Sequence, residues 1–135
     1  MVRYTDKIDG LEASQLAGFF DGWPVQPSPE MHLRMLRGSD YVVLALDGDQ
    51  VVGFVTAITD GVLSAYIPFL EVLPDYRRQG IGKELIRLIL MKLEDYYMID
   101  LTCDPELRSF YVSMGMSAHT AMCLRRKENQ AGKTS

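Results

Sequence analysis

Two arginines and two glycines stand directly ahead of the longest amphipathic pattern in the chain. They lie in the run Arg77-Arg78-Gln79-Gly80-Ile81-Gly82, which follows an apolar segment that ends at Pro74. Glycine lets the backbone approach a ligand closely, and the first N–H groups of a helix have no partner within the helix. Such groups bind anions at the positive end of the helix dipole. This stretch therefore predicts a phosphate-binding turn.

Two well-known phosphate-binding loops fit this stretch poorly. A Walker loop requires Ser or Thr after Gly82-Lys83, but Glu84 stands there. A dinucleotide-binding loop requires a third glycine, where this chain has Leu85, although Asp100 lies near the expected position of its acidic residue. It also requires a tight turn directly after the strand, whereas residues 74–79 intervene here.

The turn instead resembles the Gln/Arg-x-x-Gly-x-Gly/Ala signature of the GCN5-related N-acetyltransferases, the GNAT family. The preceding Leu70-x-Val72-x-Pro74 resembles the end of the strand that leads into that signature. Further along, Phe110-Tyr111 and Gly115 keep the spacing of the family's late helix motif, with Met116 in place of the usual aromatic residue. The resemblance covers about residues 40–116 and implies acetyl transfer from acetyl-CoA.

The order of the expected elements favours an α+β fold with a mixed, mostly antiparallel sheet flanked by helices. Strands are expected at 2–5, 41–46, 51–58, 62–73, 98–103 and 118–125, and helices at 10–22, 29–38, 79–96 and 106–114. Strands and helices do not alternate strictly, so a doubly wound sheet is not expected. Pro68 has no N–H and predicts a break inside the fourth strand. The family resemblance implies the acyl-CoA N-acyltransferase (GNAT) fold.

Length and composition restrict the class of protein. The 135 residues indicate one domain, residues 1–126, followed by a polar stretch, residues 127–135, that is expected to be disordered. A net charge of −4 argues against nucleic-acid binding and mildly favours amine substrates. Cys103 and Cys123 lack the spacing of metal ligands, so no metal is expected. No apolar run is long enough for a membrane span, and the absence of a cysteine framework favours the cytoplasm.

The resemblance also implies where acetyl-CoA binds. Backbone groups freed by the break at Pro68 would pair with pantetheine like an added strand, and the glycine turn would hold the pyrophosphate. Asp104 occupies a position near which the family often has an asparagine that reaches pantetheine. The expected cofactor-binding residues are Leu70, Val72, Arg77, Arg78, Gln79, Gly80, Ile81, Gly82, Lys83 and Asp104.

Acetyl transfer to an amine needs a base and an acid. A free alkylamine with a pKa of about 10.4 is almost fully protonated at pH 7, so a base must remove its proton. Glu71, between apolar neighbours on the strand before the turn, is the candidate base, because burial raises the pKa of a carboxyl group. Tyr111 matches the family's tyrosine and is the candidate acid for the departing thiolate. The competing interpretations are a surface glutamate and a core tyrosine.

The aromatic side chains of Phe20, Trp23 and Tyr66 are candidates for an acceptor pocket, although aromatic residues at helical spacing more often fill a core. The predicted function is transfer of an acetyl group from acetyl-CoA to a primary amine by direct attack in a ternary complex. The alternative is a non-catalytic acyl-CoA-binding sensor or interaction module with the same fold. We expect a small-molecule amine rather than a protein as the acceptor, and apolar edge strands are compatible with a homodimer.

Overall fold

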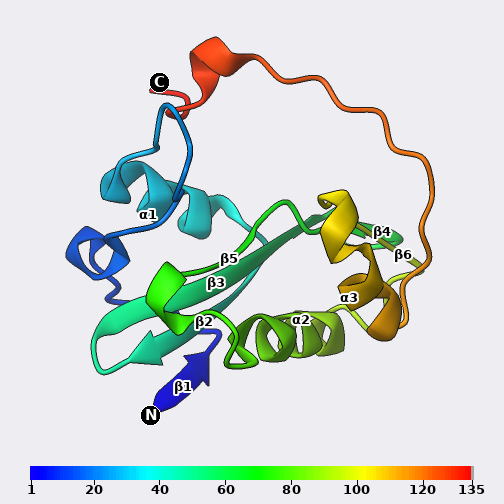
Figure 1. The fold of residues 1–135 in the computed structure, drawn as a ribbon, viewed down its shortest axis with the longest axis horizontal. Coiled ribbons are helices and arrows are strands. Elements are labelled where there is room, and N and C mark those ends of the chain that lie inside the picture. Colours follow the sequence, from blue (N-terminus) through cyan, green and yellow to red (C-terminus); the bar gives the residue numbers. More distant parts are fainter. Residues whose placement is uncertain (135) are drawn as a thin grey trace.

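The computed structural model describes residues 1–134, which form a six-stranded sheet between helices (Figure 1). The strands are β1 (Val2–Thr5), β2 (Tyr41–Asp47), β3 (Gln50–Thr59), β4 (Ser64–Tyr66), β5 (Leu70–Val72) and β6 (Met98–Asp100). The α-helices are α1 (Pro29–Gly38), α2 (Ile81–Lys92) and α3 (Arg108–Ser113), and the 3-10 helices are η1 (Ala13–Leu16), η2 (Pro74–Tyr76), η3 (Pro105–Leu107) and η4 (Lys127–Asn129). None of the helices in this part of the chain is long and apolar enough to cross a membrane.

The sheet is mostly antiparallel, which confirms the predicted α+β class. Its spatial order is β1-β2-β3-β4-β6, and β5 pairs with another part of β3. The pairs β1–β2, β2–β3, β3–β4 and β3–β5 are antiparallel, and β4–β6 is parallel. The predicted helices at 29–38, 79–96 and 106–114 correspond to α1, to α2, and to η3 with α3.

Both faces of β2 are buried, because alternate residues along it enter two different cores. Val43 and Ala45 pack on the α2 face, in a cluster that includes Leu85. Leu44 packs on the opposite face, in a cluster that includes Leu36 of α1. A strand that is covered on both sides is apolar throughout, which explains why β2 lacks a polar–apolar alternation.

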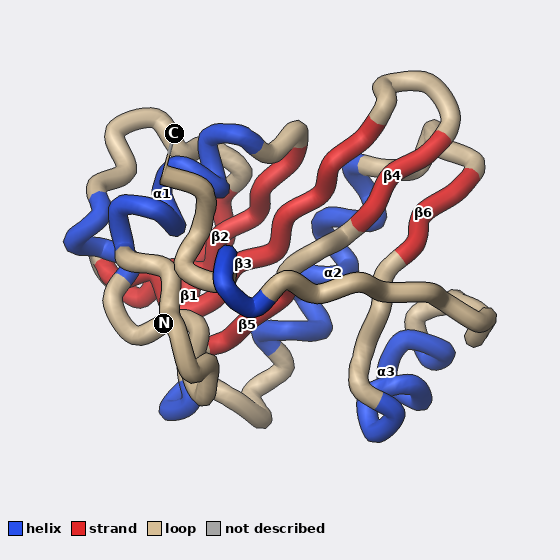
Figure 2. Tube along the Cα trace, turned by 90° about the horizontal axis from the view of Figure 1, so that it is seen from above, coloured by secondary structure: helices blue, strands red, loops and turns tan. Residues whose placement is uncertain are grey.

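The strand predicted at 62–73 is broken in two around Pro68. One half, β4, pairs with the parallel strand β6, while the other half, β5, pairs with residues 53–55 of β3. Figure 2 shows β4 and β6 diverging from β5. The predicted break is therefore confirmed, and the sheet opens between β5 and the chain that follows β6.

The helix predicted over residues 10–22 is wrong, since this stretch contains only the short turn η1. Gly18 and Phe20 adopt left-handed backbone conformations, with φ of 94° and 63°, and a right-handed helix cannot continue through them. The N–H of Phe20 instead donates to the side chain of Glu71. Leu16 and Phe20 are nevertheless buried, so the apolar spacing identified core residues in a loop rather than a helix.

The strand predicted over residues 118–125 is also wrong. This stretch takes part in no strand pair among residues 1–134, and Figure 1 shows it as an arc outside the sheet. A strand requires a neighbour for its N–H and C=O groups, and the recorded pairs give it none. The chain then returns to the body at η4, where Gln130 Oε1 accepts a hydrogen bond from Val25 N–H at 3.2 Å. Gln130 thus lies against the loop before α1.

Candidate active site

One edge of β5 is free of strand pairing in the described chain. On its other edge β5 pairs with β3. Beyond the ends of this pairing, the carbonyl of Phe69 accepts the N–H of Thr56 at 3.1 Å, and the N–H of Leu73 donates to the carbonyl of Val52 at 2.8 Å. Because backbone groups alternate in direction along a strand, those of Leu70 and Val72 point away from β3. Arg77 Nε donates to the carbonyl of Val72 at 2.9 Å. The remaining groups of this edge are available to an extended ligand.

The glycine turn leads into α2 with unpaired N–H groups. Gly80 is the N-cap residue at φ 83°, and no side chain caps the helix. The first recorded bond of the helix runs from Glu84 N–H to the carbonyl of Gly80 at 3.1 Å. The N–H groups of Ile81, Gly82 and Lys83 have no recorded partner within residues 1–134. This geometry suits an anion, because free N–H groups and the helix dipole act at one place.

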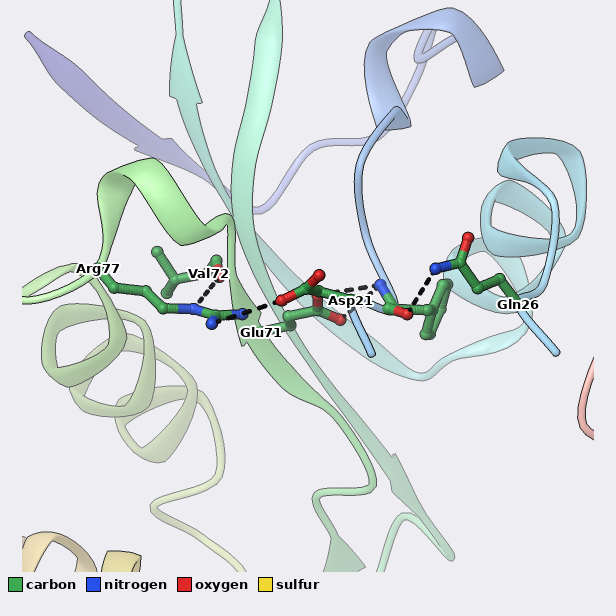
Figure 3. A network of polar contacts seen from close by, with 6 residues as sticks. Asp21, Gln26, Glu71, Val72 and Arg77 are labelled. Atoms are coloured by element: carbon green, nitrogen blue, oxygen red, sulfur yellow. Dashed lines mark hydrogen bonds and ion pairs between the residues drawn. The ribbon is translucent and has the colours of Figure 1, made fainter. Parts of the chain in front are cut away.

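The carboxylate of Glu71 holds the loop that precedes α1 (Figure 3). Both of its oxygens accept the Phe20 N–H at 2.9 Å, and Oε2 also accepts the Asp21 N–H at 3.3 Å. Asp21 in turn lies 3.8 Å from Arg77. The carbonyl of Phe20 accepts a bond from Gln26 Nε2 at 3.1 Å. This network joins the strand before the glycine turn to the loop before α1.

Burial raises the proton affinity of the Glu71 carboxylate. Desolvation of the half-buried carboxyl group raises the pKa of Glu71 above its ordinary value of 4.5, and this outweighs the opposing effects of the two N–H groups and of Arg77. A carboxylate with a raised pKa binds a proton more tightly than an exposed one does. The same carboxylate also holds Phe20 at its positive φ, so a structural role accompanies the candidate chemical role.

The phenol of Tyr111, on α3, lines a smaller cavity of about 330 Å³ together with Thr102 and Cys103. Tyr111 is only 9% exposed. Burial, and after it the neighbouring Cys103, raise the pKa of Tyr111 above 10.0. The phenol therefore keeps its proton at neutral pH, and no hydrogen bond of its hydroxyl is recorded in the described part of the chain. A protonated phenol beside a cavity can donate that proton.

A larger cavity of about 1160 Å³ has Glu71 in its wall. Its lining includes all three aromatic candidates for the acceptor pocket, Phe20, Trp23 and Tyr66. The ring centroids of Phe20 and Trp23 are 4.9 Å apart, and the hydroxyl of Tyr66 lies 3.3 Å from Thr102 Oγ1. Thr102 lines both the cavity that Glu71 lines and the cavity that Tyr111 lines.

The other predicted cofactor residues lie at the surface. Arg77 lines the larger cavity, whereas Arg78 and Lys83 are exposed around the glycine turn. Asp104 is exposed as well and lines neither cavity. Within residues 1–134, no group of three or more His, Cys, Asp or Glu side chains is placed to hold a metal ion.

Two parts of the larger cavity were not predicted. His32 is 1% exposed, lines the cavity and has no hydrogen-bond partner within the described chain at either ring nitrogen. Burial lowers the pKa of His32 to about 4, so the ring is neutral at pH 7. His32 lies four residues before the buried Leu36, and this helical spacing could have indicated that His32 faces the same buried side of α1. The second part is a wall formed by residues 125–133, a polar segment without any local pattern that indicates it.

Comparison with known proteins identifies a family that matches most of this chain. The acetyltransferase (GNAT) family model matches residues 8–116. A crystal structure from Deinococcus radiodurans R1, assigned as an acetyltransferase, is 44% identical with a TM-score of 0.96, and the match covers 99% of this chain and 94% of that one. A GNAT family acetyltransferase from Streptococcus pneumoniae TIGR4 is 28% identical with a TM-score of 0.77, covering 93% and 98%.

Curated relatives are more distant and longer. An uncharacterised N-acetyltransferase, ycf52, from Gracilaria tenuistipitata var. liui is 30% identical over 101 residues, or 70% of this chain. The chain spans 54 to 66% of the length of the three ycf52 proteins that it matches. The family match includes the open strand β5, the glycine turn and α3, as the sequence resemblance predicted. The chain belongs to the GNAT family of acetyltransferases.

Proposed function

We propose that this protein transfers the acetyl group of acetyl-CoA to a primary amine by direct attack in a ternary complex. One observation carries the proposal: the open edge of β5 leads, through a short turn, to the unpaired N–H groups at the start of α2. Pantetheine and a pyrophosphate are joined in the same linear order in CoA. The cavity that holds the candidate base is lined by Leu70 of this edge, and it shares Thr102 with the cavity that the candidate acid lines.

The residues of this path fit CoA. The free backbone groups of Leu70 and the N–H of Val72 would pair with the amide groups of pantetheine, in the manner of an added strand. The N–H groups of residues 81–83 would hold the pyrophosphate, with the exposed side chains of Arg78 and Lys83 adding positive charge. Acetyl-CoA supplies the acetyl group as a thioester, which is activated for attack by an amine.

Two side chains would move the protons of the reaction. Glu71 takes a proton from the amine, directly or through water, so that the nitrogen lone pair can form a bond to the acetyl carbon. A backbone N–H of the open edge stabilises charge on the acetyl oxygen. As the carbon–sulfur bond breaks, the hydroxyl of Tyr111 gives its proton to the sulfur. The attacking nitrogen loses its second proton to water, and the proton held by Glu71 returns through water to the Tyr111 phenolate. The products are the N-acetylated amine, the free thiol of CoA and one released proton.

Ligand binding and turnover test the proposal separately. At about 100 times its Kd, acetyl-CoA should stabilise the fold by about 2.7 kcal/mol and raise Tm by several degrees, whereas NADH should not. Release of free thiol should then require both acetyl-CoA and an amine drawn from a panel. Stabilisation by acetyl-CoA without acetylation of any amine would favour the alternative, a non-catalytic acyl-CoA-binding module. Stabilisation by NADH instead would overturn the CoA site itself.

Replacing Gly82 with valine should weaken acetyl-CoA binding by about tenfold or more, because a side chain there would cover the surface that the pyrophosphate approaches. A β-carbon on Gly82 would lie no closer than 3.9 Å to Val72 Cγ2, so the fold should accept it. Gly38→Val, where a β-carbon meets nothing within 4 Å, is the matched control at a helix position outside the site. Calorimetric titration with acetyl-CoA measures both, and equal affinities would contradict the assignment of the turn.

We also propose that two copies of the chain associate through residues 118–125. Met122 and Leu124 in this arc are 92% and 72% exposed, and its backbone takes part in no strand pair among residues 1–134. Strand β6 pairs with β4 on one side, and no strand of residues 1–134 pairs with its other side. An extended segment and an open sheet edge complement each other in a second copy.

Size-exclusion chromatography with light-scattering detection tests this association. The unchanged protein should elute as a dimer, and the double variant Met122→Asp, Leu124→Asp should elute as a monomer with an unchanged far-UV spectrum. Val62→Asp, at another exposed apolar position, should stay dimeric. A monomeric wild-type protein at about 100 μM would contradict the proposal, since stable dimers associate well below that concentration.

A further inference from the structure

The larger cavity has a local charge opposite to that of the whole chain. Its lining includes six cationic side chains, those of Arg34, Arg77, Arg125, Arg126, Lys127 and Lys133. Two carboxylates, Asp21 and Glu71, line it as well, which leaves an excess of four positive charges. The complete chain carries −4. A concave surface concentrates the field of its own charges, so a ligand inside the cavity meets the positive lining rather than the negative average.

The acids of the cavity are engaged and most of its cations are not. The Glu71 carboxylate accepts backbone N–H groups, and Asp21 lies 3.8 Å from Arg77. None of the other five cationic side chains forms an ion pair within residues 1–134. The charge that remains free to bind a ligand is therefore positive, and Arg125 and Arg126 are two of the five side chains that carry it.

Specific contacts seat the cationic wall on the domain. The carbonyl of Lys133 accepts a bond from Arg34 Nη1 at 3.2 Å, in addition to the bond from Val25 N–H to the side chain of Gln130. Gly132 lies so close to Met31 that a β-carbon on it would be 2.8 Å from Met31 Cε. Residues 125–133, which we call the C-terminal wall, thus complete the cavity from a segment without a sequence signal.

The rest of the cavity offers aromatic, largely apolar surface. Phe20, Trp23 and Phe69 contribute aromatic rings, with Trp23 and Phe69 centroids 6.4 Å apart. His32 lines the same cavity, almost fully buried and without a hydrogen-bond partner for either ring nitrogen in the described chain. Because neither ring nitrogen is accessible from the cavity, His32 contributes packed ring surface to the lining rather than a polar contact for a ligand.

We propose that the acceptor is a small amine that also carries an anionic group, a carboxylate or a phosphate. The C-terminal wall binds the anionic group, the aromatic rings contact the carbon skeleton, and the amine reaches Glu71. This inference rests on the proposed acetyl transfer and adds the substrate class. The negative net charge by itself favours purely cationic amines, but the charges nearest the bound molecule decide its binding, because more distant charges are screened.

Matched pairs of amines test the substrate class. Suitable pairs are n-butylamine with 4-aminobutyrate, tyramine with tyrosine, and ethanolamine with O-phosphoethanolamine. In at least one pair the anionic member should have a kcat/KM about tenfold or more above its uncharged counterpart, and raising the ionic strength from about 0.01 M to about 1 M should erase the difference. The first two pairs report on a carboxylate and the third on a phosphate.

A charge-neutralised variant locates the preference. Arg125→Gln, Arg126→Gln, Lys127→Gln should raise KM for the anionic amine by about tenfold, as expected for the loss of three exposed charges, and leave kcat/KM for its uncharged counterpart unchanged. Arg3→Gln, Lys7→Gln, Arg37→Gln removes the same charge outside both cavities and should change neither constant. Calorimetric binding of the same amines to the complex with CoA should repeat the pattern without turnover.

Each remaining outcome has one meaning. Equal kcat/KM within every pair overturns the substrate class and leaves acetyl transfer standing. If the triple variant weakens binding of CoA itself and leaves the preference among amines intact, the wall serves the phosphates of CoA, and the inference fails. If no amine is acetylated although acetyl-CoA binds, the proposed function fails. In that case, calorimetry still tests the acceptor class: if no amine of any pair binds to the complex with CoA, the acceptor class is overturned as well.

Discussion

Tyr111→Phe should lower kcat by about 100-fold or more while the Kd of acetyl-CoA stays within about twofold. The substitution removes one oxygen and keeps the ring that fills the wall of the smaller cavity. Without the hydroxyl, the sulfur must leave as an unprotonated thiolate, and general acid catalysis is worth about 10² to 10⁴ in rate. The raised pKa of Tyr111 means that the wild-type acid is protonated across the neutral range.

Single-turnover measurements of thiol release, with calorimetric titration of acetyl-CoA, separate chemistry from binding. Tyr97→Phe is the matched control, because Tyr97 is exposed and lines neither cavity. If the kcat of Tyr111→Phe equals that of the wild type, Tyr111 is not the acid, and the interpretation as a core tyrosine is correct. A variant with weakened CoA binding and normal kcat would show instead that the hydroxyl only contacts the cofactor.

Glu71→Gln should also lower kcat by about 100-fold, because an amide cannot accept the proton of the amine. The amide oxygen can still accept the N–H of Phe20, which bonds to Glu71 at 2.9 Å, so the loop before α1 should keep its place. A purely structural glutamate predicts a different result, namely a lower Tm with little change in kcat. Glu94→Gln, at an exposed position outside both cavities, is the control.

The pH profile gives Glu71 a second signature. A base must be ionised, so kcat/KM of the wild type should rise with pH through the raised pKa of Glu71, above the ordinary value of 4.5. This rising limb should vanish in Glu71→Gln, and its persistence there would assign the base to another group.

The contribution of Glu71 to stability should fall as pH rises, whereas its contribution to kcat/KM should rise. Because the folded protein holds the Glu71 proton more tightly than the unfolded chain does, the contribution of this group to the free energy of unfolding is greatest below pH 4.5. It is lost as pH rises through the folded pKa. Denaturant titrations across this window should therefore show a smaller fall in stability for Glu71→Gln than for the wild type. An equal fall in both proteins would contradict a raised pKa for Glu71.

The sequence alone determined the features whose causes are local. Pro68 lacks an N–H, so it breaks a strand wherever the strand lies, and Gly80 permits the positive φ at which α2 begins. The apolar periodicity of residues 79–96 specified a helix, since one face of it had to be buried. The family signature rests on these same short patterns, which is why the fold and the glycine turn ahead of α2 followed from residue types and spacing.

Tertiary structure decided what joins distant residues. Glu71 accepts a hydrogen bond from the backbone N–H of Phe20, 51 positions earlier. Phe20 lies in the loop that residues 10–22 form where periodicity predicted a helix. The wall that carries Arg125 and Arg126 arrives from the far end of the chain and encloses a cavity built mainly from residues 20–77. Propensity and periodicity act over a few neighbouring residues, whereas the charge and shape of a cavity depend on which segments pack together.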